Sequence, residues 1–426
     1  MLNVMDRRSF LGMLAANSAF LAAARAAGKP AYHVGVGYSS DSYTAASVAL
    51  SACGQFPANL AGQTVMIKPN LVAPYPASSG ATTDPLVVEA IVDRSIAAGA
   101  TQILIVEAAP PGQPSNFVPC GYTTVFASYP QVQLVDLRTG TYVLTPVPGG
   151  GYAYQSMWVP SLVLQPDTYF ISAAKLKTHG DAVVTLSMKN LVGLAYETAY
   201  APPVNSHYPR HDLHLRGINE SIMDLNMMRP VDFAVIDGVW GMEGQGPTQG
   251  TPVATDVVLA GLNHVAVDRV GLNVMEIPQD AVTYLTYAAE AGLGPANTSK
   301  VTLRGDTYTP YPFVRAKTPP VLFRPVASPD TIAAGQSTSI AYQIKTSCYT
   351  SAAIIQDSDA TPTVVPVRTL HDFALVSAPG ETLTWNGRDD AGAAVAPGTY
   401  LAQIQAAASP TSPAVNYASG RITVTA

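Results

Sequence analysis

Charged side chains are scarce in this 426-residue sequence. Only 12% of the residues are Asp, Glu, Lys or Arg, against roughly 25% in an average soluble domain. The formal net charge is −6, and the chain has no basic tract. Because nucleic-acid binding relies on basic surfaces that displace counterions, this composition argues against a nucleic-acid partner.

Cysteine is also scarce. Cys53, Cys120 and Cys348 are far apart, and no C-x-x-C pair occurs. The sequence therefore supports neither an iron–sulfur cluster nor a cysteine-based zinc site. We expect the three residues to be small and buried. In an oxidising compartment, one disulfide would still leave one thiol over.

Long apolar runs are lacking after residue 30, so the mature chain has no predicted transmembrane helix. Residues 1–27 have the pattern of an export signal, with Arg7-Arg8, an Ala/Leu run and Ala-rich cleavage sites. The paired arginines before Phe10-Leu11 resemble a twin-arginine signal, which exports folded proteins. An ordinary secretory signal is the alternative. Both predict a periplasmic or extracellular protein, and the twin-arginine route favours a bound metal or prosthetic group.

Strands and helices alternate through residues 28–317. The segment 82–100 is predicted as a helix capped by Asp84, with Pro85 at its first position and Gly99 after its end. Apolar strands at 64–72 and 102–109 flank it, which makes a βαβ unit. Further strands are predicted at 32–37, 168–177, 231–240 and 255–263, and further helices at 41–53, 181–194, 216–229, 263–276 and 280–292. We predict an α/β domain with a mostly parallel sheet and helices on both faces.

The composition changes near Thr318. Residues 318–332 are predicted as a linker and residues 333–426 as a small all-β sandwich with short alternating strands. The stretch "WNGRDDAGAAVAPGTYLAQIQA" (385–406) resembles the Ig-like domain of flagellar hook-capping proteins. We expect Trp385 and Tyr400 in its core and Gly392 and Gly398 in turns. This resemblance implies contact with a cell surface or another protein, and no chemistry.

Positive charge is concentrated in "KLKTHGDAVVTLSMKN" (175–190). Between residues 139 and 209 the only cationic residues are Lys175, Lys177 and Lys189. Few carboxylates are near in sequence, so the lysines are predicted to line a cleft where parallel strands end. The predicted anion-binding residues are Lys68, Asn70, Lys175, Lys177 and Asn190. The alternative is a structural network of salt bridges with distant partners such as Asp237, Glu243 and Asp268.

A glycine-rich loop, "EGQGP", follows the predicted strand that ends near Asp237. It lacks the pattern of a P-loop or of a dinucleotide fingerprint. Gly244 and Gly246 are nevertheless candidate ligand-binding positions. Glu243, together with His179 and Lys189, is a candidate catalytic residue, since each of these side chains can transfer a proton.

Histidines cluster in "SHYPRHDLHLRG", with His207, His211 and His214 inside eight residues. Imidazoles at this spacing can share one face and bind a divalent metal. Our metal candidates are His207, His211 and Asp237, because a carboxylate would complete such a site. A solvated loop is the alternative.

Four segments in order, "IKPNLV…TTDP", "KLKTHGDAVVTLSMKNLVGL", "VIDGVWGMEGQGPTQGTPV" and "LAGLNHVAVDRVG", resemble the family called domain of unknown function 362, over about residues 32–305. Many members carry ferredoxin-type cysteine motifs that this chain lacks, so electron transfer is not implied. The family has no generally established activity. The order of His179, Lys189 and the later histidines is also similar to that in nickel-pincer lactate racemases.

Together these observations predict a metal- or cofactor-dependent enzyme that acts on an anionic small molecule. The alternative is a periplasmic or surface module that binds an anionic ligand without changing it.

Overall fold

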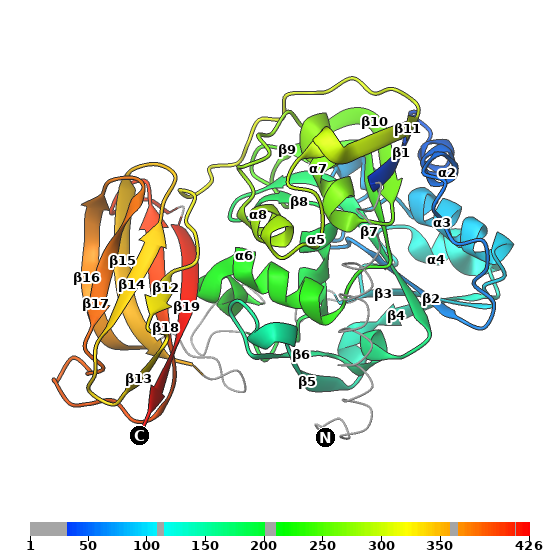
Figure 1. The fold of residues 1–426 in the computed structure, drawn as a ribbon. Coiled ribbons are helices and arrows are strands. Elements are labelled where there is room, and N and C mark those ends of the chain that lie inside the picture. The colour runs from blue at the N-terminus through cyan, green and yellow to red at the C-terminus, as the bar shows by residue number, and fades with distance from the viewer. Residues whose placement is uncertain (1–31, 109–114, 201–209, 358–364, 414) are drawn as a thin grey trace.

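The computed structural model describes residues 32–108, 115–200, 210–357, 365–413 and 415–426. The predicted export signal at residues 1–27 lies outside these ranges. The described chain forms an α/β domain followed by all-β sheets, as the sequence predicts (Figure 1). No helix within these ranges is both long and apolar enough to cross a membrane.

Within the described residues, nine strands form the central sheet of the α/β domain. Their order is β11-β1-β10-β9-β7-β2-β3-β4, and β8 pairs with β7. The bounds are Tyr32–Tyr38 (β1), Thr64–Pro69 (β2), Gln102–Glu107 (β3), Val132–Asp136 (β4), Thr168–His179 (β7), Val183–Thr185 (β8), Phe233–Glu243 (β9), Thr251–Gly261 (β10) and Val301–Gly305 (β11). Strands β5 (Tyr142–Pro146) and β6 (Ser156–Pro160) form a separate antiparallel pair.

The sheet is mostly parallel. Strands β4, β3, β2, β7 and β9 run in one direction, whereas β10 is antiparallel to its neighbours β9 and β1. The parallel run brings the carboxyl ends of β2, β3, β7 and β9 to one edge of the sheet. In open α/β sheets, ligands bind beyond this edge.

Helices cover both faces of the sheet (Figure 1). On one face lie α2 (Ser42–Ala52), α3 (Pro85–Ala97) and α4 (Tyr122–Val125), and on the other lie α5 (Ser187–Asn190), α6 (His211–Met228), α7 (His264–Val274) and α8 (Thr283–Glu290). Each face has its own apolar core because strand side chains alternate between faces: Val65 and Ile67 enter one core and Met66 enters the other.

The caps predicted for the helix after β2 are confirmed. The Asp84 side chain accepts a hydrogen bond from the backbone N–H of Leu86 at 2.9 Å, and Pro85 is the first helical residue. Gly99 follows the helix with a φ of 93°, a conformation that glycine adopts without strain. Cys53, Cys120 and Cys348 are buried thiols, as expected.

The predicted helix at 181–194 is wrong in its first half. Residues Val183–Thr185 form β8, which pairs with the end of β7, and α5 begins only at Ser187. The reason is a distant carboxylate. Asp268 accepts hydrogen bonds from the backbone N–H groups of Ser187 at 2.7 Å and Met188 at 3.0 Å, and so fixes the helix start there. A 3₁₀ turn, Leu191–Leu194, follows α5.

Two sheets form the C-terminal domain. One contains β12 (Val326–Ser328), β14 (Thr338–Gln343) and β17 (Gly380–Trp385), and the other contains β13 (Thr331–Ala333), β15 (Cys348–Gln356), β16 (Pro366–Val376), β18 (Gly398–Ala407) and β19 (Val415–Thr425). The first strand starts at Val326, inside the range predicted as linker. Trp385 is fully buried and its ring centroid lies 5.4 Å from that of Tyr400, so both residues belong to the core, as predicted.

Candidate functional site

The predicted lysines lie at the carboxyl edge of the sheet. Lys68 is near the end of β2, and Lys175, Lys177 and His179 are in the last part of β7. Lys189 comes from α5, which packs against β7. All five side chains are at least nine-tenths buried. Their surroundings divide the lysines into two classes, according to whether a carboxylate accompanies the ammonium group.

Lys68 has a carboxylate partner. Its Nζ lies 2.9 Å from Glu107 Oε1 and 3.0 Å from Glu107 Oε2, and it also donates to the carbonyl of Pro69. Burial lowers the pKa of Lys68, and the Glu107 carboxylate opposes this shift. Gly193 packs on the pair, since a Cβ there would lie 2.9 Å from Lys68 Nζ. Glu107 was not among the predicted site residues, although it is the last residue of the apolar strand β3, just as Lys68 is the last but one of β2.

Lys175 is also neutralised. Its Nζ lies 2.7 Å from Asp237 Oδ2, and neither side chain is exposed to solvent. Asp237 further accepts hydrogen bonds from the backbone N–H groups of Asp84 at 2.8 Å and Val239 at 3.1 Å. The structure thus places Lys175 and Asp237, predicted as an anion ligand and a metal ligand, in an ion pair with each other.

Lys177 is buried without a carboxylate. Its Nζ donates to Asn70 Oδ1 at 2.9 Å and to the backbone carbonyls of Ala81 at 2.5 Å and Pro247 at 3.2 Å. Burial holds the pKa of Lys177 well below its usual range, and the nearby charges of Lys189 and Lys175 lower it further. Neutral oxygens therefore surround this ammonium group and leave its charge uncompensated.

Lys189 has neither a hydrogen bond nor an ion pair with any residue in the described part of the chain. Its side chain is about 8% exposed. Burial lowers its pKa to about 8, although the charge of Asp181 raises it in part. Asp268 anchors the start of the same short helix, and burial raises the pKa of that carboxyl to about 7.

His179 is held in a defined orientation. Its Nδ1 accepts hydrogen bonds from the backbone N–H groups of Asp181 at 3.1 Å and Ala182 at 3.3 Å. Because Nδ1 is an acceptor, this pattern assigns the proton of the neutral ring to Nε2. Burial keeps the pKa of His179 well below its usual range, and the charges of Lys189 and His214 act in the same direction.

A second histidine lies beside His179. The ring of His214 stacks on it with centroids 6.1 Å apart and an angle of 18° between the planes. His214 Nδ1 is 2.9 Å from Asp181 Oδ2. The sequence indicated the histidine cluster but gave no sign that its third member would reach the motif around His179.

Two asparagine side chains connect the site's elements. Asn70 Nδ2 donates to Asn190 Oδ1 at 3.1 Å, and Asn190 Nδ2 donates to the carbonyl of Lys68 at 2.9 Å and to Ser172 Oγ at 3.1 Å. These bonds tie α5 to the end of β2 and to Ser172 within β7. They fix the position of Lys189 relative to Lys177, because Asn70 also accepts from Lys177.

The glycine-rich loop packs against β7, but Glu243 contacts a different region. Thr178 Oγ1 donates to the Gly244 carbonyl at 2.8 Å, and Gly180 N–H donates to the Gly246 carbonyl at 3.2 Å. Glu243 Oε2 instead accepts from the backbone N–H of Val314 at 2.8 Å. Among the described contacts, none joins Glu243 to His179 or the lysines.

The metal candidates are not brought together in the described residues. His207 lies outside them, and for His211 only the backbone, at the start of α6, is described. Within the described ranges no three His, Cys, Asp or Glu side chains form a group that could hold a metal ion. A metal bound through His207 and His211 therefore stays a prediction.

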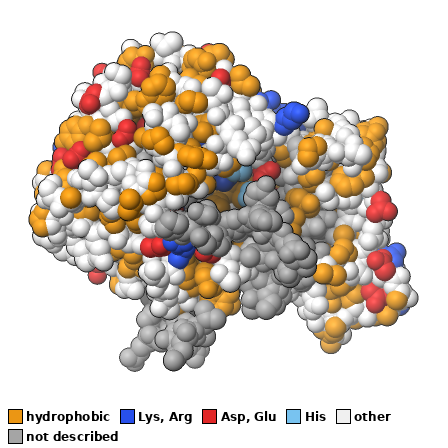
Figure 2. All heavy atoms as spheres, turned by 180° about the vertical axis from the view of Figure 1, so that it is seen from behind, with side chains coloured by type: hydrophobic (Ala, Val, Ile, Leu, Met, Phe, Trp, Pro, Cys, Tyr) orange, Lys and Arg blue, Asp and Glu red, His pale blue; other side chains and the backbone are white. Residues whose placement is uncertain are grey.

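Some basic side chains reach the surface on one side of the molecule. Figure 2 shows Lys or Arg and His side chains in a recess between the α/β domain and the C-terminal domain. Two other hollows, of about 470 and 500 Å³, are lined by residues of α7, α8 and the segments after them, and contain none of the predicted site residues. We place the site at the carboxyl edge of the sheet, because Lys177 and Lys189 lie there without a carboxylate partner among the described residues.

Comparison with known proteins agrees with the family resemblance. A family model described as a domain of unknown function, DUF362, matches residues 65–273. A thylakoid-associated protein of Synechocystis sp. is 24% identical over 237 residues, which cover 55% of this chain and 68% of that protein.

Among solved structures, the lactate racemase apoprotein from Thermoanaerobacterium thermosaccharolyticum matches 58% of this chain with 13% identity and a TM-score of 0.34. The matched part spans 57% of the racemase chain. Similarity at this level says nothing about the substrate, the cofactor or the reaction of the present protein.

Proposed function

We propose that this protein binds an anionic small molecule with Lys177 and Lys189 and transfers protons to or from it with Lys189 and His179. One observation carries the proposal: buried positive groups converge at the ligand-binding edge of the sheet without a carboxylate partner. Lysine is almost never buried unless paired, and burying an isolated charge is costly. A bound carboxylate or phosphate would supply the missing negative charge.

The proposed anion would accept a charge-assisted hydrogen bond from Lys189. Lys177 would attract the anion through its charge alone, because the three N–H groups of its ammonium are already used by neutral oxygens. Charge-assisted hydrogen bonds are about twice as strong as bonds between neutral groups, and they gain strength when water is excluded. Lys68 and Lys175 are already neutralised by Glu107 and Asp237, so they serve to shape the site. The anion-binding role predicted for four lysines is thereby narrowed to Lys177 and Lys189.

Proton transfer is supported by the state of two groups. A pKa of about 8 leaves a fraction of Lys189 as free amine near neutral pH, and groups with a pKa near the working pH are efficient acids and bases. His179 is neutral, with its Nδ1 acceptor occupied by backbone N–H groups. Its Nε2–H is the proton that it could donate.

Binding is tested by titrating the full-length protein with inorganic phosphate and with malonate and following the heat released. We expect Lys189→Met to weaken binding of the better anion at least tenfold, about 1.4 kcal/mol, as expected for one charge-assisted hydrogen bond. Lys177→Met should also weaken binding, because a positive charge beside the anion is lost. Lys300→Met is the matched control, because Lys300 is exposed and lies in the 3₁₀ turn before β11, outside the site. Equal affinity in all four proteins would contradict the proposal.

A binding module without catalysis is the second candidate. It is favoured by Glu243, whose carboxylate is engaged by Val314 instead of lying beside the lysines. The two candidates differ at His179. For an enzyme, His179→Gln would retain anion binding and lose turnover in a screen of anionic substrates. For a binding module, no turnover would be found in either protein.

We further propose that the protein is exported, on the basis of Arg7-Arg8 and the following Ala/Leu run. The test is the intact mass of protein recovered after native export, together with its elemental analysis. Loss of about 27 residues would support a cleaved signal. A stoichiometric metal in the same sample would support the cofactor-dependent form of the proposal, with His207 and His211 as the first ligands to mutate.

A further inference from the structure

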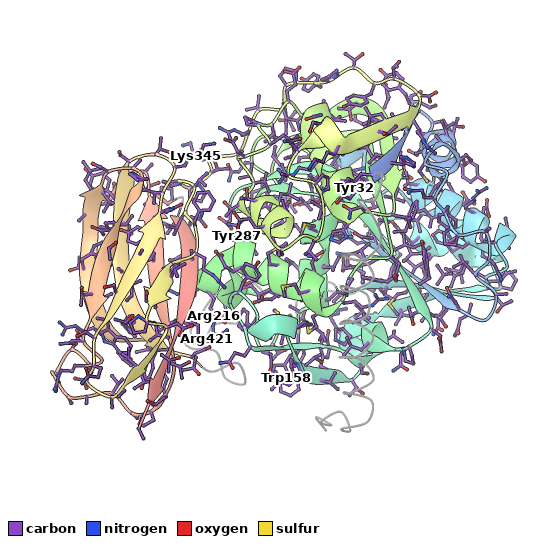
Figure 3. The ribbon with its side chains drawn as sticks, viewed as in Figure 1. Tyr32, Trp158, Arg216, Tyr287, Lys345 and Arg421 are labelled. Carbon is purple, nitrogen blue, oxygen red and sulfur yellow. The ribbon has the colours of Figure 1, made fainter. Side chains whose placement is uncertain are left out.

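The helix that carries His214 lies between the two domains. Helix α6 packs against β19 of the C-terminal domain on one side and against α5 and α8 of the α/β domain on the other (Figure 1). Arg216 and Arg421 mark the junction in Figure 3. The C-terminal domain, predicted from the sequence to contact a cell surface or another protein and to carry no chemistry, therefore contacts an element of the candidate site.

The residues of α6 that contact the C-terminal domain follow His214 directly in the sequence. The side-chain amide of Gln403, on β18, donates to the carbonyl of Leu215 at 2.6 Å. Arg216 Nη1 lies 2.6 Å from Asp357 Oδ1, and Arg421 Nε lies 3.4 Å from Asp357 Oδ2. Arg216 is fully buried and Asp357 nearly so. The two residues that follow His214 are thus both fixed to the C-terminal domain.

A close approach of the two backbones accompanies these bonds. Gly217 interrupts α6 with a φ of 119°, and a Cβ at this position would lie 3.1 Å from the carbonyl oxygen of Tyr417 on β19. Only glycine adopts this conformation readily. The helix therefore bends where it meets β19, which defines the direction of the turn that carries His214.

From His214 the contacts continue to His179. His214 Nδ1 lies 2.9 Å from Asp181 Oδ2, and the backbone N–H of Asp181 donates to His179 Nδ1. These contacts support the turn between β7 and β8. The turn leads into Val183, the first residue of β8, whose φ of 66° is rare for a β-branched residue and therefore has to be held by its surroundings.

We infer that the C-terminal domain is a working part of the site, in which Gln403 and Asp357 are positioning residues that hold His214, and through Asp181 hold the ring of His179. The inference rests on the proposed function in one respect only, which is the assignment of His179 as the acid–base group. It assigns to the C-terminal domain control of the tautomer and orientation of the candidate acid–base group. A spacer would touch the α/β domain without any effect on His179.

The test uses the full-length, ligand-free protein and the ring ¹⁵N shifts of His179, followed by NMR between pH 5 and pH 8. The charged groups that face this ring are Lys177, Lys189, Asp181 and His214. In the wild type we expect a neutral ring with the proton on Nε2 throughout. In Gln403→Ala, we expect a mixture of both tautomers and a pKa nearer the usual value, because α6 is less firmly held and the ring is better solvated.

Lys345→Ala is the matched control. It breaks the Lys345–Asp280 ion pair, which also joins the two domains but does not involve α6. We expect its His179 shifts to equal those of the wild type. Asp357→Asn should act like Gln403→Ala, with a larger effect, if it folds. Gln403→Ala removes only a neutral hydrogen bond and is therefore the variant on which the test depends.

Unchanged tautomer and titration in folded Gln403→Ala would overturn the inference. Phosphate and malonate binding, measured on the same samples, separates this failure from failure of the proposed function. If the wild type binds neither anion, the proposed function is contradicted, whereas the shifts of His179 still decide the inference. If the wild type binds, we expect Gln403→Ala to retain the affinity, because Lys177 and Lys189 hold the anion and Gln403 contacts neither of them.

Discussion

Lys175 and Lys177 are two residues apart on one strand, and neither side chain is exposed to solvent, yet their surroundings are opposite. Lys175 has a carboxylate, Asp237, at 2.7 Å, whereas Lys177 has one side-chain amide oxygen and two backbone carbonyls. Burial alone therefore does not separate a structural lysine from a functional one. The presence of a counter-charge does separate them, because the two charges of an ion pair neutralise each other, whereas an isolated buried ammonium group keeps its net charge.

The same contrast holds for Lys68, which contacts Asn190, and Lys189, which precedes Asn190 in the chain. Lys68 is bound by Glu107, and Asn190 contacts the Lys68 backbone. Lys189, next to Asn190 in the chain, has no partner among the residues described. Each paired lysine thus has an uncompensated neighbour, and the charge of Lys189 lowers the pKa of Lys177.

The largest effect is expected at the paired lysine. Lys175→Met leaves Asp237 buried without a counter-charge, which should cost about 3–5 kcal/mol in the free energy of unfolding, measured by urea denaturation. Lys177→Met should cost less than about 2 kcal/mol, because only neutral oxygens lose a partner and a buried charge is removed. Adding Asp237→Asn to Lys175→Met should recover part of the loss. Equal losses for Lys175→Met and Lys177→Met would abolish the distinction.

Lys189→Met is expected to stabilise the protein at pH 7. The folded-state pKa of about 8 is below the unfolded value of about 10.5, so the folded protein binds fewer protons between these values. The penalty for burying the charged amine is complete below pH 8 and is relieved as the pH rises toward 10.5. The gain should be at most about 3 kcal/mol at pH 7 and should disappear near pH 10.5.

The measurement is the difference in unfolding free energy between the wild type and Lys189→Met from pH 6 to pH 10.5. Taking the difference cancels the titration of other groups. A variant that is less stable than the wild type at pH 7 would show that Lys189 has a counter-charge in solution.

Gly193→Ala is expected to disturb the Lys68–Glu107 pair. The added Cβ would lie 2.9 Å from Lys68 Nζ and 3.0 Å from Glu107 Oε1. Overpacking of this kind costs about 1–3 kcal/mol, which thermal unfolding would detect. Gly140→Ala is the matched control, because Gly140 has an ordinary φ of −88° and the nearest atom to an added Cβ would be the Leu137 carbonyl oxygen at 3.4 Å. No loss on Gly193→Ala would mean that the pair can shift without cost.

The smallest effect is expected at an exposed lysine. Lys345 and Asp280 form an ion pair in which both side chains are largely accessible to solvent. Exposed pairs contribute about 0–1 kcal/mol and are weakened by salt. Lys345→Ala should therefore change the melting temperature little, and the change should shrink further in high salt. A large drop in the melting temperature would show that this ion pair contributes substantially to the stability of the contact between the two domains.

Local signals in the sequence predicted much of the fold. Asp84 and Pro85 identify the start of α3 because a cap and a first-turn proline act on their own helix. Continuous apolar runs identify β2, β3, β7 and β9 because strands buried on both faces need no polar alternation. The start of α5 was mispredicted because it depends on Asp268, about 80 residues away along the chain.

The sequence by itself determined that lysines and a histidine follow the strands of a mostly parallel sheet, and that the terminal region forms β-sheets. Only the tertiary structure decided which lysine meets which carboxylate, because Glu107 and Asp237 come from neighbouring strands whose order the chain does not state. It also decided that His214 stacks on His179. The contact between the C-terminal domain and α6, the helix that carries His214, was likewise decided there. Such pairings depend on the packing of segments that are distant in sequence, which no local pattern encodes.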